Sequence, residues 1–248
     1  MIHYHGLPIT PSDAAIRALT ARHAMVSFAN PEQVALAAEV CQSFACDNGA
    51  FTTWKSGQPY KIDAYLNWLH EWRHHPGFDW CLIPDVIDGN ELDNRKLCES
   101  WPLPRHLSVP VWHLHESLDY LGWMCSVWPR IAFGSSGQWS DPGSDSWWDR
   151  MSQAMSVACD SRGRPVCKLH GLRMLNPTIT SHLPLSSADS CGVARNLGMD
   201  VAWDKPGSYL TGLSKPVRAM ILAERYERHA NASQWYGRHT QMSFELLG

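Results

Sequence analysis

The sequence lacks several features that would place it in a class at once. Its eight cysteines include no Cys-x-x-Cys pair, and no run of about 18 apolar residues long enough to span a membrane occurs. The first six residues, Met-Ile-His-Tyr-His-Gly, do not follow the pattern of a secretion signal. These absences predict reduced cysteines, no membrane partner and a cytoplasmic protein.

A basic surface charge is also missing. Lys and Arg number 21 against 24 Asp and Glu, for a formal charge of -3, so no global field favours nucleic acid and any such contact would be local. The chain has no internal repeat, no low-complexity segment, and neither a G-x-G-x-x-G nor a P-loop pattern. Dinucleotide and P-loop nucleotide binding therefore have no support from motifs.

The chain has what one large domain needs. Its 248 residues are 44% hydrophobic, enough for one substantial core, and we expect a single domain over residues 1–248. Tryptophan and histidine are both abundant, at 13 each. Tryptophan side chains suit base stacking, but packing explains most of them.

Short apolar segments alternate with amphipathic ones along the whole sequence. Eight expected strands cover residues 23–29, 41–46, 78–84, 109–114, 130–134, 164–170, 183–188 and 199–203. Expected helices cover residues 12–21, 30–41, 62–74, 91–101, 117–128, 145–159, 190–196 and 216–229, and residues 3–11 read as a loop. This alternation over about 250 residues is typical of a (β/α)8 TIM barrel. A doubly wound open sheet is the alternative.

Three carboxylates directly follow expected strands: Asp47, Asp85 and Asp189. Each could be a helix N-cap, and Asp47 could instead make an Asx-turn with the backbone two residues on. In a barrel, however, all three would meet at the carboxyl ends of the strands, where active sites form. Neighbouring carboxylates can divide nucleophile and proton-carrier roles, as they do in glycosyl chemistry.

Further polar residues fall at the other strand ends. His113 and His115 follow the fourth expected strand, and Lys168 and His170 lie on the sixth. The run 134–137, Gly-Ser-Ser-Gly, follows the fifth, where Gly134 would let a ligand approach the backbone and Ser135 would add a hydroxyl. The alternative for this run is a flexible loop.

Several of these motifs together resemble the tRNA-guanine transglycosylases. Asp47-Asn48-Gly49-Ala50-Phe51 is similar to that family's Asp-Ser-Gly-Gly-Phe, and later matches keep the family's order over about residues 24 to 204. They are Ile-Pro-Asp-Val at 83–86, Phe-Gly-Ser-Ser-Gly at 133–137, Leu-His-Gly-Leu at 169–172, Ser-Ala-Asp-Ser at 187–190 and Ala-Arg-Asn at 194–196. The resemblance implies a TIM barrel that exchanges guanine for a 7-deazaguanine at C1′ of a nucleotide.

The resemblance also implies residue roles. Asp189 would be the nucleophile that forms a covalent sugar intermediate, and Asp47 the general acid and base. Asp85 would accept hydrogen bonds from N1 and the exocyclic amine of the base. The remaining matches imply base stacking by Phe51 and His170, a side-chain contact from His113 where the family has Gln, and a backbone amide from Gly134, with Ser135 and Lys168 as further substrate-binding candidates.

One departure from the family concerns zinc. The family's Cys-x-Cys-x-x-Cys zinc site cannot exist in its usual form, because Cys191 is the only cysteine after Asp189. With the short chain, this favours the DNA branch, the compact 7-deazaguanine DNA transglycosylases of phages and bacteria, acting in the host cytoplasm if phage-encoded. The implied partners are DNA and a free 7-deazaguanine such as 7-cyano-7-deazaguanine, with no cofactor or metal; tRNA is the alternative substrate. Residues that could line a DNA groove are Trp54, Lys55, Trp139, Trp147, Trp148, Arg150 and Lys168.

Two rival classes remain. His3-x-His5 with Lys168, His170 and Asp189 superficially copies the ligand set of the metal-dependent amidohydrolases, but the expected first strand begins about twenty residues after the His pair. A non-catalytic DNA-binding barrel is the other rival. In such a protein the three carboxylates would repel the phosphates of DNA and contribute nothing to binding.

Overall fold

The computed structural model describes residues 1–87, 89–199, 203, 211–228 and 230–237. The chain divides into two compact units, each built from separate stretches of sequence. The terminal unit comprises residues 2–81 and 189–228. The central unit comprises the described residues of 82–188 and 230–237, with Met1. Two strands run across the boundary between these stretches, so each unit contains part of the same sheet.

Four parallel strands form the sheet of the terminal unit. They are β1 (Ile2–Gly6), β2 (His23–Ser27), β3 (Ser43–Asp47) and β4 (Phe78–Leu82), paired in sequence order. Their central residues are buried because apolar side chains cover both faces, as expected for parallel strands. Tyr4 and Trp80 are fully buried, and Nε1 of Trp80 donates to the Tyr4 hydroxyl at 3.0 Å.

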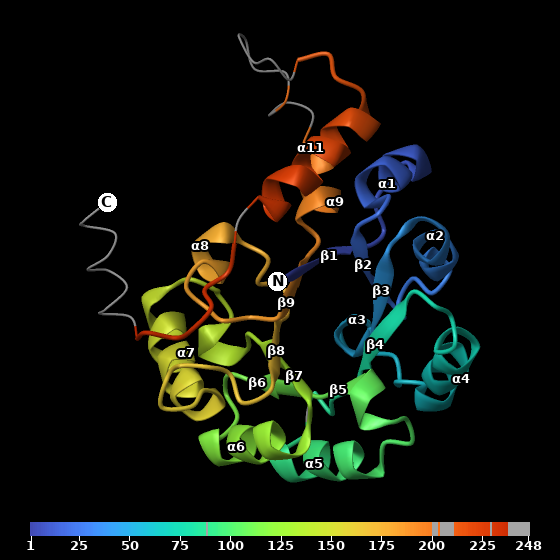
Figure 1. Cartoon of the computed structure of the whole chain (residues 1–248). Coiled ribbons are helices and arrows are strands. Elements are labelled where there is room, and N and C mark those ends of the chain that lie inside the picture. Colours follow the sequence, from blue (N-terminus) through green and yellow to red (C-terminus); the bar gives the residue numbers. More distant parts are fainter. Residues whose placement is uncertain (88, 200–202, 204–210, 229, 238–248) are drawn as a thin grey trace, which may run out of the picture. The chain divides into compact units, whose positions relative to one another are not determined.

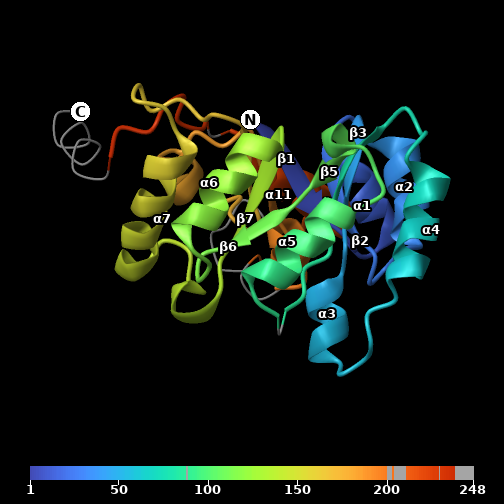
Figure 2. The ribbon, with the colours of Figure 1, turned by 90° about the horizontal axis from the view of Figure 1, so that it is seen from below.

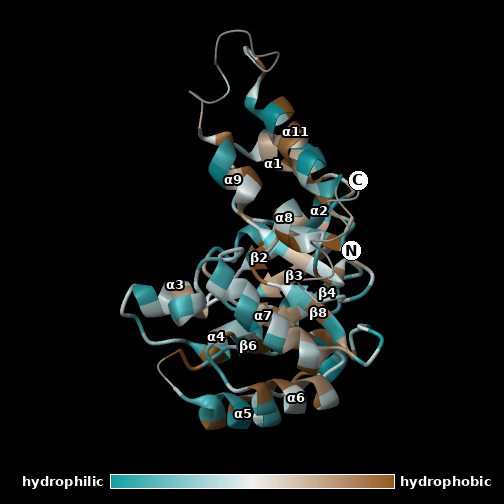
Figure 3. Ribbon diagram, turned by 90° about the vertical axis from the view of Figure 1, so that its left-hand side faces the viewer, coloured by the Kyte–Doolittle hydropathy of each residue, from teal (hydrophilic) through white to brown (hydrophobic). Residues whose placement is uncertain are grey.

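Helices cover the terminal unit's strands in the usual alternation. They are α1 (Ser12–Leu19), α2 (Gln33–Val40), α3 (Ala50–Lys55), α4 (Ile62–Trp72), α9 (Gly192–Leu197) and α11 (Lys215–Glu227). In Figure 1, α2 and α4 lie on the outer side of β2 to β4. Figures 2 and 3 show the short helix α3 apart from them, projecting beyond the end of β3. Helix α3 was not expected from the sequence.

The central unit continues the sheet with β5 (Ser108–Val109), β6 (Val111–His113), β7 (Arg130–Gly134), β8 (Lys168–Gly171) and β9 (Ser187–Ser190). The strands β6 to β9 pair in parallel, in sequence order. Pro110 separates β5 from β6 because proline has no N–H to donate. Its carbonyl still accepts from Ala132 N at 2.9 Å, so residues 108–113 occupy a single strand position.

The central unit's helices are α5 (Glu91–Ser100), α6 (Leu118–Val127), α7 (Asp145–Ala158) and α8 (Pro177–Thr180), with short 3₁₀ turns at Arg105–Leu107 and Gly137–Trp139. Serine hydroxyls cap two of them: Ser117 accepts from Tyr120 N, and Ser144 accepts from Trp147 N. Within the described residues, no helix of either unit is both long and apolar enough to cross a bilayer.

The sheet order is β5-β4-β3-β2-β1-β9-β8-β7-β6. Since β5 and β6 share one position, nine segments fill the eight strand positions of a (β/α)8 barrel, and the expected fold class is confirmed. The parallel strands direct Asp47, His113 and Gly134, each the last residue of its strand, to carboxyl ends. This is the edge at which a TIM barrel builds its site.

Two expectations about the strands need correction. The first strand is Ile2–Gly6, within residues that were expected to form a loop, so the expectation of a first strand at residues 23–29 is wrong. The expected strand at residues 199–203 falls largely outside the described residues, and Trp203, which is described, is helical. The nine strand segments of the described residues already fill the eight strand positions.

Candidate active site

None of the three strand-end aspartates is the N-cap of the helix that follows it. That residue is Gly49 for α3, Asn90 for α5 and Cys191 for α9. Asn90 caps α5 through a complete capping box with Asp93. The simplest structural explanation for Asp47, Asp85 and Asp189, that each caps a helix, therefore fails for all three.

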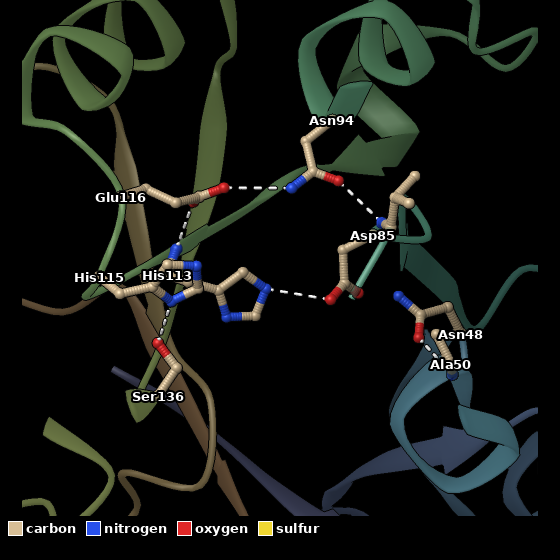
Figure 4. Close-up of polar contacts among 9 residues, drawn as sticks. Asn48, Ala50, Asp85, Asn94, His113, His115, Glu116 and Ser136 are labelled. Atoms are coloured by element: carbon tan, nitrogen blue, oxygen red, sulfur yellow. Dashed lines mark hydrogen bonds and ion pairs between the residues drawn. The ribbon is translucent and has the colours of Figure 1, made fainter. Parts of the chain in front are cut away.

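The turn after β3 is closed by the neighbours of Asp47. Asn48, which is buried, makes the Asx-turn: its Oδ1 accepts from Ala50 N at 2.8 Å (Figure 4). Gly49 has φ +69°, and a Cβ there would lie 2.8 Å from Ala29 N. Asp47 itself contributes its carbonyl, which accepts from Phe28 N at 2.9 Å. The Asx-turn predicted as an alternative role for Asp47 is thus made by Asn48, and Asp47, a partly exposed residue, ends β3 directly before that turn.

Phe51 lies on α3, directly after this turn. Its side chain is 48% exposed, and Trp54 on the same helix is 46% exposed. Their ring centroids are 5.9 Å apart with planes inclined by 33°. Two large, half-exposed aromatic side chains therefore lie on the helix that follows Asp47, and they leave apolar area unburied.

Asp85 and His113 form the closest ionisable pair of the central unit's strand ends. Oδ2 of Asp85, just after β4, lies 3.0 Å from Nε2 of His113, the last residue of β6 (Figure 4). The side chains keep 17% and 21% of their surface exposed. Burial lowers the pKa of His113, but the hydrogen bond and charge of Asp85, aided by Glu116, outweigh it, so the pKa is raised.

Two buried residues that the sequence did not single out, Glu116 and Asn94, make hydrogen bonds to the backbone on both sides of this pair. Glu116 accepts from the backbone N of His113 at 2.7 Å through Oε2, and from Asn94 Nδ2 at 3.1 Å through Oε1. Asn94 in turn accepts from Val86 N at 2.7 Å (Figure 4). Burial raises the pKa of Glu116, against the opposing effect of these hydrogen bonds. Glu116 lies in the segment after β6 and Asn94 in a polar helix, and neither position gives a local sequence signal.

His115 extends the cluster toward solvent. Its ring stacks on His113, with centroids 5.6 Å apart and planes inclined by 22°, and its Nδ1 lies 2.6 Å from Ser136 Oγ (Figure 4). Burial and the charge on His113 lower the pKa of His115. The two imidazoles therefore differ: the pKa is raised for the one paired with Asp85 and lowered for the exposed one.

Gly134 and Ser135 end β7 beside this cluster. A Cβ on Gly134 would lie 2.8 Å from His113 Nδ1 and 3.2 Å from a Val111 methyl, so only glycine leaves His113 its place. Ser135 Oγ accepts from Nε1 of the fully buried Trp147 at 2.9 Å. Ser135 thus anchors a core tryptophan, and Trp147 packs in the core instead of lining a groove.

Lys168 and His170 lie on β8, and neither is placed as expected for substrate binding. His170 is fully buried, with Nδ1 2.8 Å from Ser187 Oγ, so in this conformation it offers no surface to a stacking base. Lys168 is exposed at the first residue of β8, the end opposite to the carboxyl end. It borders an open groove of about 450 Å³, whose other lining residues include Pro129, Cys167, Pro184, Leu185 and Asn231.

Asp189 lies on β9 with 6% of its surface exposed, which makes it a buried carboxylate. The turn after it is made by Ser190, whose Oγ accepts from Gly192 N at 2.9 Å. At the end of β1, a Cβ on Gly6 would come within 2.6 Å of Cys191 Sγ, so glycine is required for close packing here.

Among the expected site residues, Asp85, His113 and Gly134 are brought together in the central unit, and Asp47, Phe51 and Asp189 belong to the terminal unit.

The His3-x-His5 pair lies within β1, so the expectation that about twenty residues separate it from the first strand is wrong. His5 is fully buried, and its Nε2 lies 3.0 Å from Oε1 of Glu227, which Arg22 also contacts at 2.9 Å. Spacing therefore no longer argues against the amidohydrolase alternative, but a hydrogen bond to Glu227 already engages His5 Nε2. Among the described residues, no three His, Cys, Asp or Glu side chains are grouped so that they could hold a metal ion.

Comparison with known proteins supports the fold alone. No family model and no curated protein matches the sequence. Solved structures of two mutants of the tryptophan synthase alpha-subunit from the hyperthermophile Pyrococcus furiosus do resemble it, with TM-scores of 0.51 and 0.50. Each is 9% identical, and the alignment covers 92% of this chain and 97% of that chain. At this identity the likeness extends to the (β/α)8 barrel and no further.

Proposed function

We propose that this protein is a base-exchange transglycosylase, a pentosyltransferase that replaces guanine in DNA with a 7-deazaguanine. The observation that carries the proposal is the Asp85–His113 pair, with Oδ2 and Nε2 3.0 Å apart at strand ends of a (β/α)8 barrel. Two further observations support the proposal. The buried Asn94 and Glu116 side chains make hydrogen bonds next to the pair. None of Asp47, Asp85 and Asp189 is a helix cap.

The pair offers the hydrogen-bonding groups that a guanine-type base needs. On its Watson–Crick edge, guanine presents two donors, N1–H and the exocyclic amine, beside the O6 acceptor. A carboxylate accepts from both donors, and Nδ1 of His113, the ring nitrogen that does not face Asp85, can donate to O6 when it carries a proton. Adenine presents an acceptor at N1, which would face the Asp85 carboxylate without a proton between them. The pair therefore favours guanine and 7-deazaguanines over adenine.

The resemblance assigns the bond-making steps to the other two carboxylates. Asp189 attacks C1′, so an O–C1′ ester forms as the C1′–N9 bond breaks, and Asp47 gives a proton to the departing guanine. Asp47 then takes the N9 proton of the incoming base as the new C1′–N9 bond forms and the ester breaks. Each glycosyl bond broken is replaced by another, so the exchange needs neither ATP nor an oxidant.

DNA is favoured over tRNA because the family's tRNA enzymes carry a cysteine cluster after the nucleophile, and only Cys191 follows Asp189 here. A base inside a duplex cannot reach a barrel mouth, so the substrate base must be flipped out or locally single-stranded. The exposed rings of Phe51 and Trp54 offer stacking surface for such an unpaired strand.

The test is to incubate the purified protein with duplex DNA, with single-stranded DNA and with tRNA, each with radiolabelled guanine or 7-cyano-7-deazaguanine. The expected result is ATP-independent entry of label into DNA, loss of label with Asp189→Ala, and weakened use of the free base with Asp85→Asn. Asp141→Asn, the same substitution at an exposed position, is the matched control. Label in tRNA alone would move the assignment to the tRNA enzymes, and no incorporation into any of the three would refute the proposal.

A further inference from the structure

A continuous chain of hydrogen bonds runs behind the Asp85–His113 pair. It starts at the backbone N–H of Val86, passes through the Asn94 side chain and the Glu116 carboxylate, and ends at the backbone N–H of His113 (Figure 4). The distances along it are 2.7, 3.1 and 2.7 Å. The chain thus joins the residue after Asp85 to the backbone of Asp85's own partner.

Both ends of this chain are fixed donors, and that dictates the chemistry between them. A backbone N–H can only donate, so the side chains between two of them must accept at both ends. An amide accepts through its oxygen and donates through its nitrogen, so Asn94 accepts from Val86 and donates to the next group. The next group must then accept twice, from Asn94 and from His113, and a carboxylate does so with its two separate oxygens.

The two side chains are buried, so water cannot easily replace a lost partner. Asn94 is 8% exposed and Glu116 is 3% exposed. Asn94 sits in the first turns of α5, where the Asn90–Asp93 capping box fixes the start of the helix. Two further bonds lock the segment around Glu116: Arg150 Nε donates to Leu114 O at 2.7 Å, and Arg150 also donates to Glu116 O.

We infer that Asn94 and Glu116 are positioning residues for the base-recognition pair: their hydrogen-bond chain sets the separation of Asp85 and His113. This inference rests on the proposed function for its consequence in catalysis. Neither side chain touches the base. They act by holding the two strand ends at the separation that lets Asp85 and His113 meet the same edge of one ring.

The direction of the chain permits a test by exchange. In Glu116→Gln the NH2 of the new amide faces another N–H donor, so one hydrogen bond is lost. In Asn94→Asp two carboxylates face each other without a proton between them. Each single variant therefore breaks the chain of hydrogen bonds. In the double variant Asn94→Asp/Glu116→Gln the order of groups is reversed. The carboxylate now at position 94 accepts from Val86 N and from the amide now at position 116, whose oxygen accepts from His113 N. Every hydrogen bond is restored without the original residues.

The first readout does not depend on catalysis. The imidazole N–H resonance of His113, assigned by its loss in His113→Gln, reports the bond to Asp85 in the protein alone. We expect it to be shifted or broadened in both single variants and restored in the double variant. Glu99→Gln, the same substitution at an exposed position of α5, is the control and should leave it unchanged.

The second readout is the exchange reaction. We expect each single variant to raise the KM for the free base about tenfold with a smaller change in kcat, and the double variant to return it to within a few-fold of wild type. An unchanged His113 resonance in both single variants, or a folded double variant that restores neither readout, overturns the inference. If the wild-type protein exchanges no base, the proposed function fails, and the His113 resonance still decides whether this chain positions the pair.

Discussion

Nε2 of His113 lies 3.0 Å from Oδ2 of Asp85, and both side chains are largely buried. The contact joins the residue that ends β6 to the loop that follows β4. It also reverses the effect of burial on the imidazole: burial lowers the pKa of His113, whereas Asp85 and Glu116 together raise it. The pair is consequently both a structural link and a pH-sensitive one.

Stability should therefore depend on pH through His113. A histidine whose folded-state pKa is raised contributes stability that is fully present below its unfolded pKa of about 6.5 and is lost as the pH rises through the folded-state value. In Asp85→Asn, burial is left to act with less opposition and the pKa of His113 should fall. We expect the free energy of unfolding lost in this variant to be larger at about pH 5.5 than at about pH 8.5, and of order 1–3 kcal/mol at the lower pH.

Urea denaturation of wild type and variant at both pH values measures this difference. The exposed Asp141→Asn is a suitable control, because a surface substitution of the same kind should change stability by less than about 0.5 kcal/mol at either pH. If Asp85→Asn destabilised the protein equally at both pH values, the His113 charge would not contribute.

Gly134→Ala should displace His113. The added Cβ would lie 2.8 Å from His113 Nδ1 and 3.1 Å from Cε1, so the imidazole or the backbone of this buried glycine must move. We expect a loss of about 1–3 kcal/mol in unfolding free energy, as for other overpacked cores. Gly122→Ala, on helix α6, is the contrast. The added Cβ would meet Val157 Cγ1 at 3.5 Å, so a gain of up to about 1 kcal/mol in unfolding free energy is expected. Thermal denaturation of both variants would show opposite signs, and equal signs would contradict the argument.

Most of the barrel could be predicted from the sequence because its strands are short apolar runs that alternate with helices. The first strand could not. Residues 2–6 place His3 and His5 in a buried strand, and the burial of His5 is compensated by Glu227, which is 222 positions away in sequence. A pattern of neighbouring residues cannot reveal a partner so distant, so the local sequence predicts a loop where the strand lies.

The candidate site likewise contains residues that the sequence predicts and residues that it does not. Asp47 at the end of β3, Asp85 after β4, Asp189 on β9 and His113 could be found because each follows or ends an apolar run. Asn94 and Glu116 were missed, since their importance lies in one hydrogen bond made across 22 residues, between a helix and the segment after a strand. Lys168 was placed wrongly for a different reason: the strand begins at this residue, so the side chain lies at the end opposite to the carboxyl end.

The turn after Asp47 should depend on Gly49 for two separable reasons. Gly49 and Gly57 have nearly the same backbone conformation, with φ +69° and +68°, but a Cβ on Gly49 would lie 2.8 Å from Ala29 N, whereas one on Gly57 has nothing within 4 Å. Gly57→Ala should therefore cost only the left-handed conformation, about 1–2 kcal/mol. Gly49→Ala should cost about 1–3 kcal/mol more, since backbone must move. Urea denaturation measures both, and equal losses would show that the turn can shift freely.

The exposed ring of Phe51 should matter for nucleic acid and not for folding. Because Phe51 is 48% exposed, Phe51→Ala should change the free energy of unfolding by less than about 0.5 kcal/mol. If its ring stacks on an unpaired base, the same change should weaken binding of a guanine-containing single-stranded oligonucleotide by about 1–3 kcal/mol, measured by fluorescence anisotropy. Leu92→Ala, at a residue 57% exposed on α5, is the matched control and should leave binding unchanged. Equal affinities for wild type and Phe51→Ala would remove Phe51 from the binding surface, and a large loss of stability would mean that its ring packs against the protein.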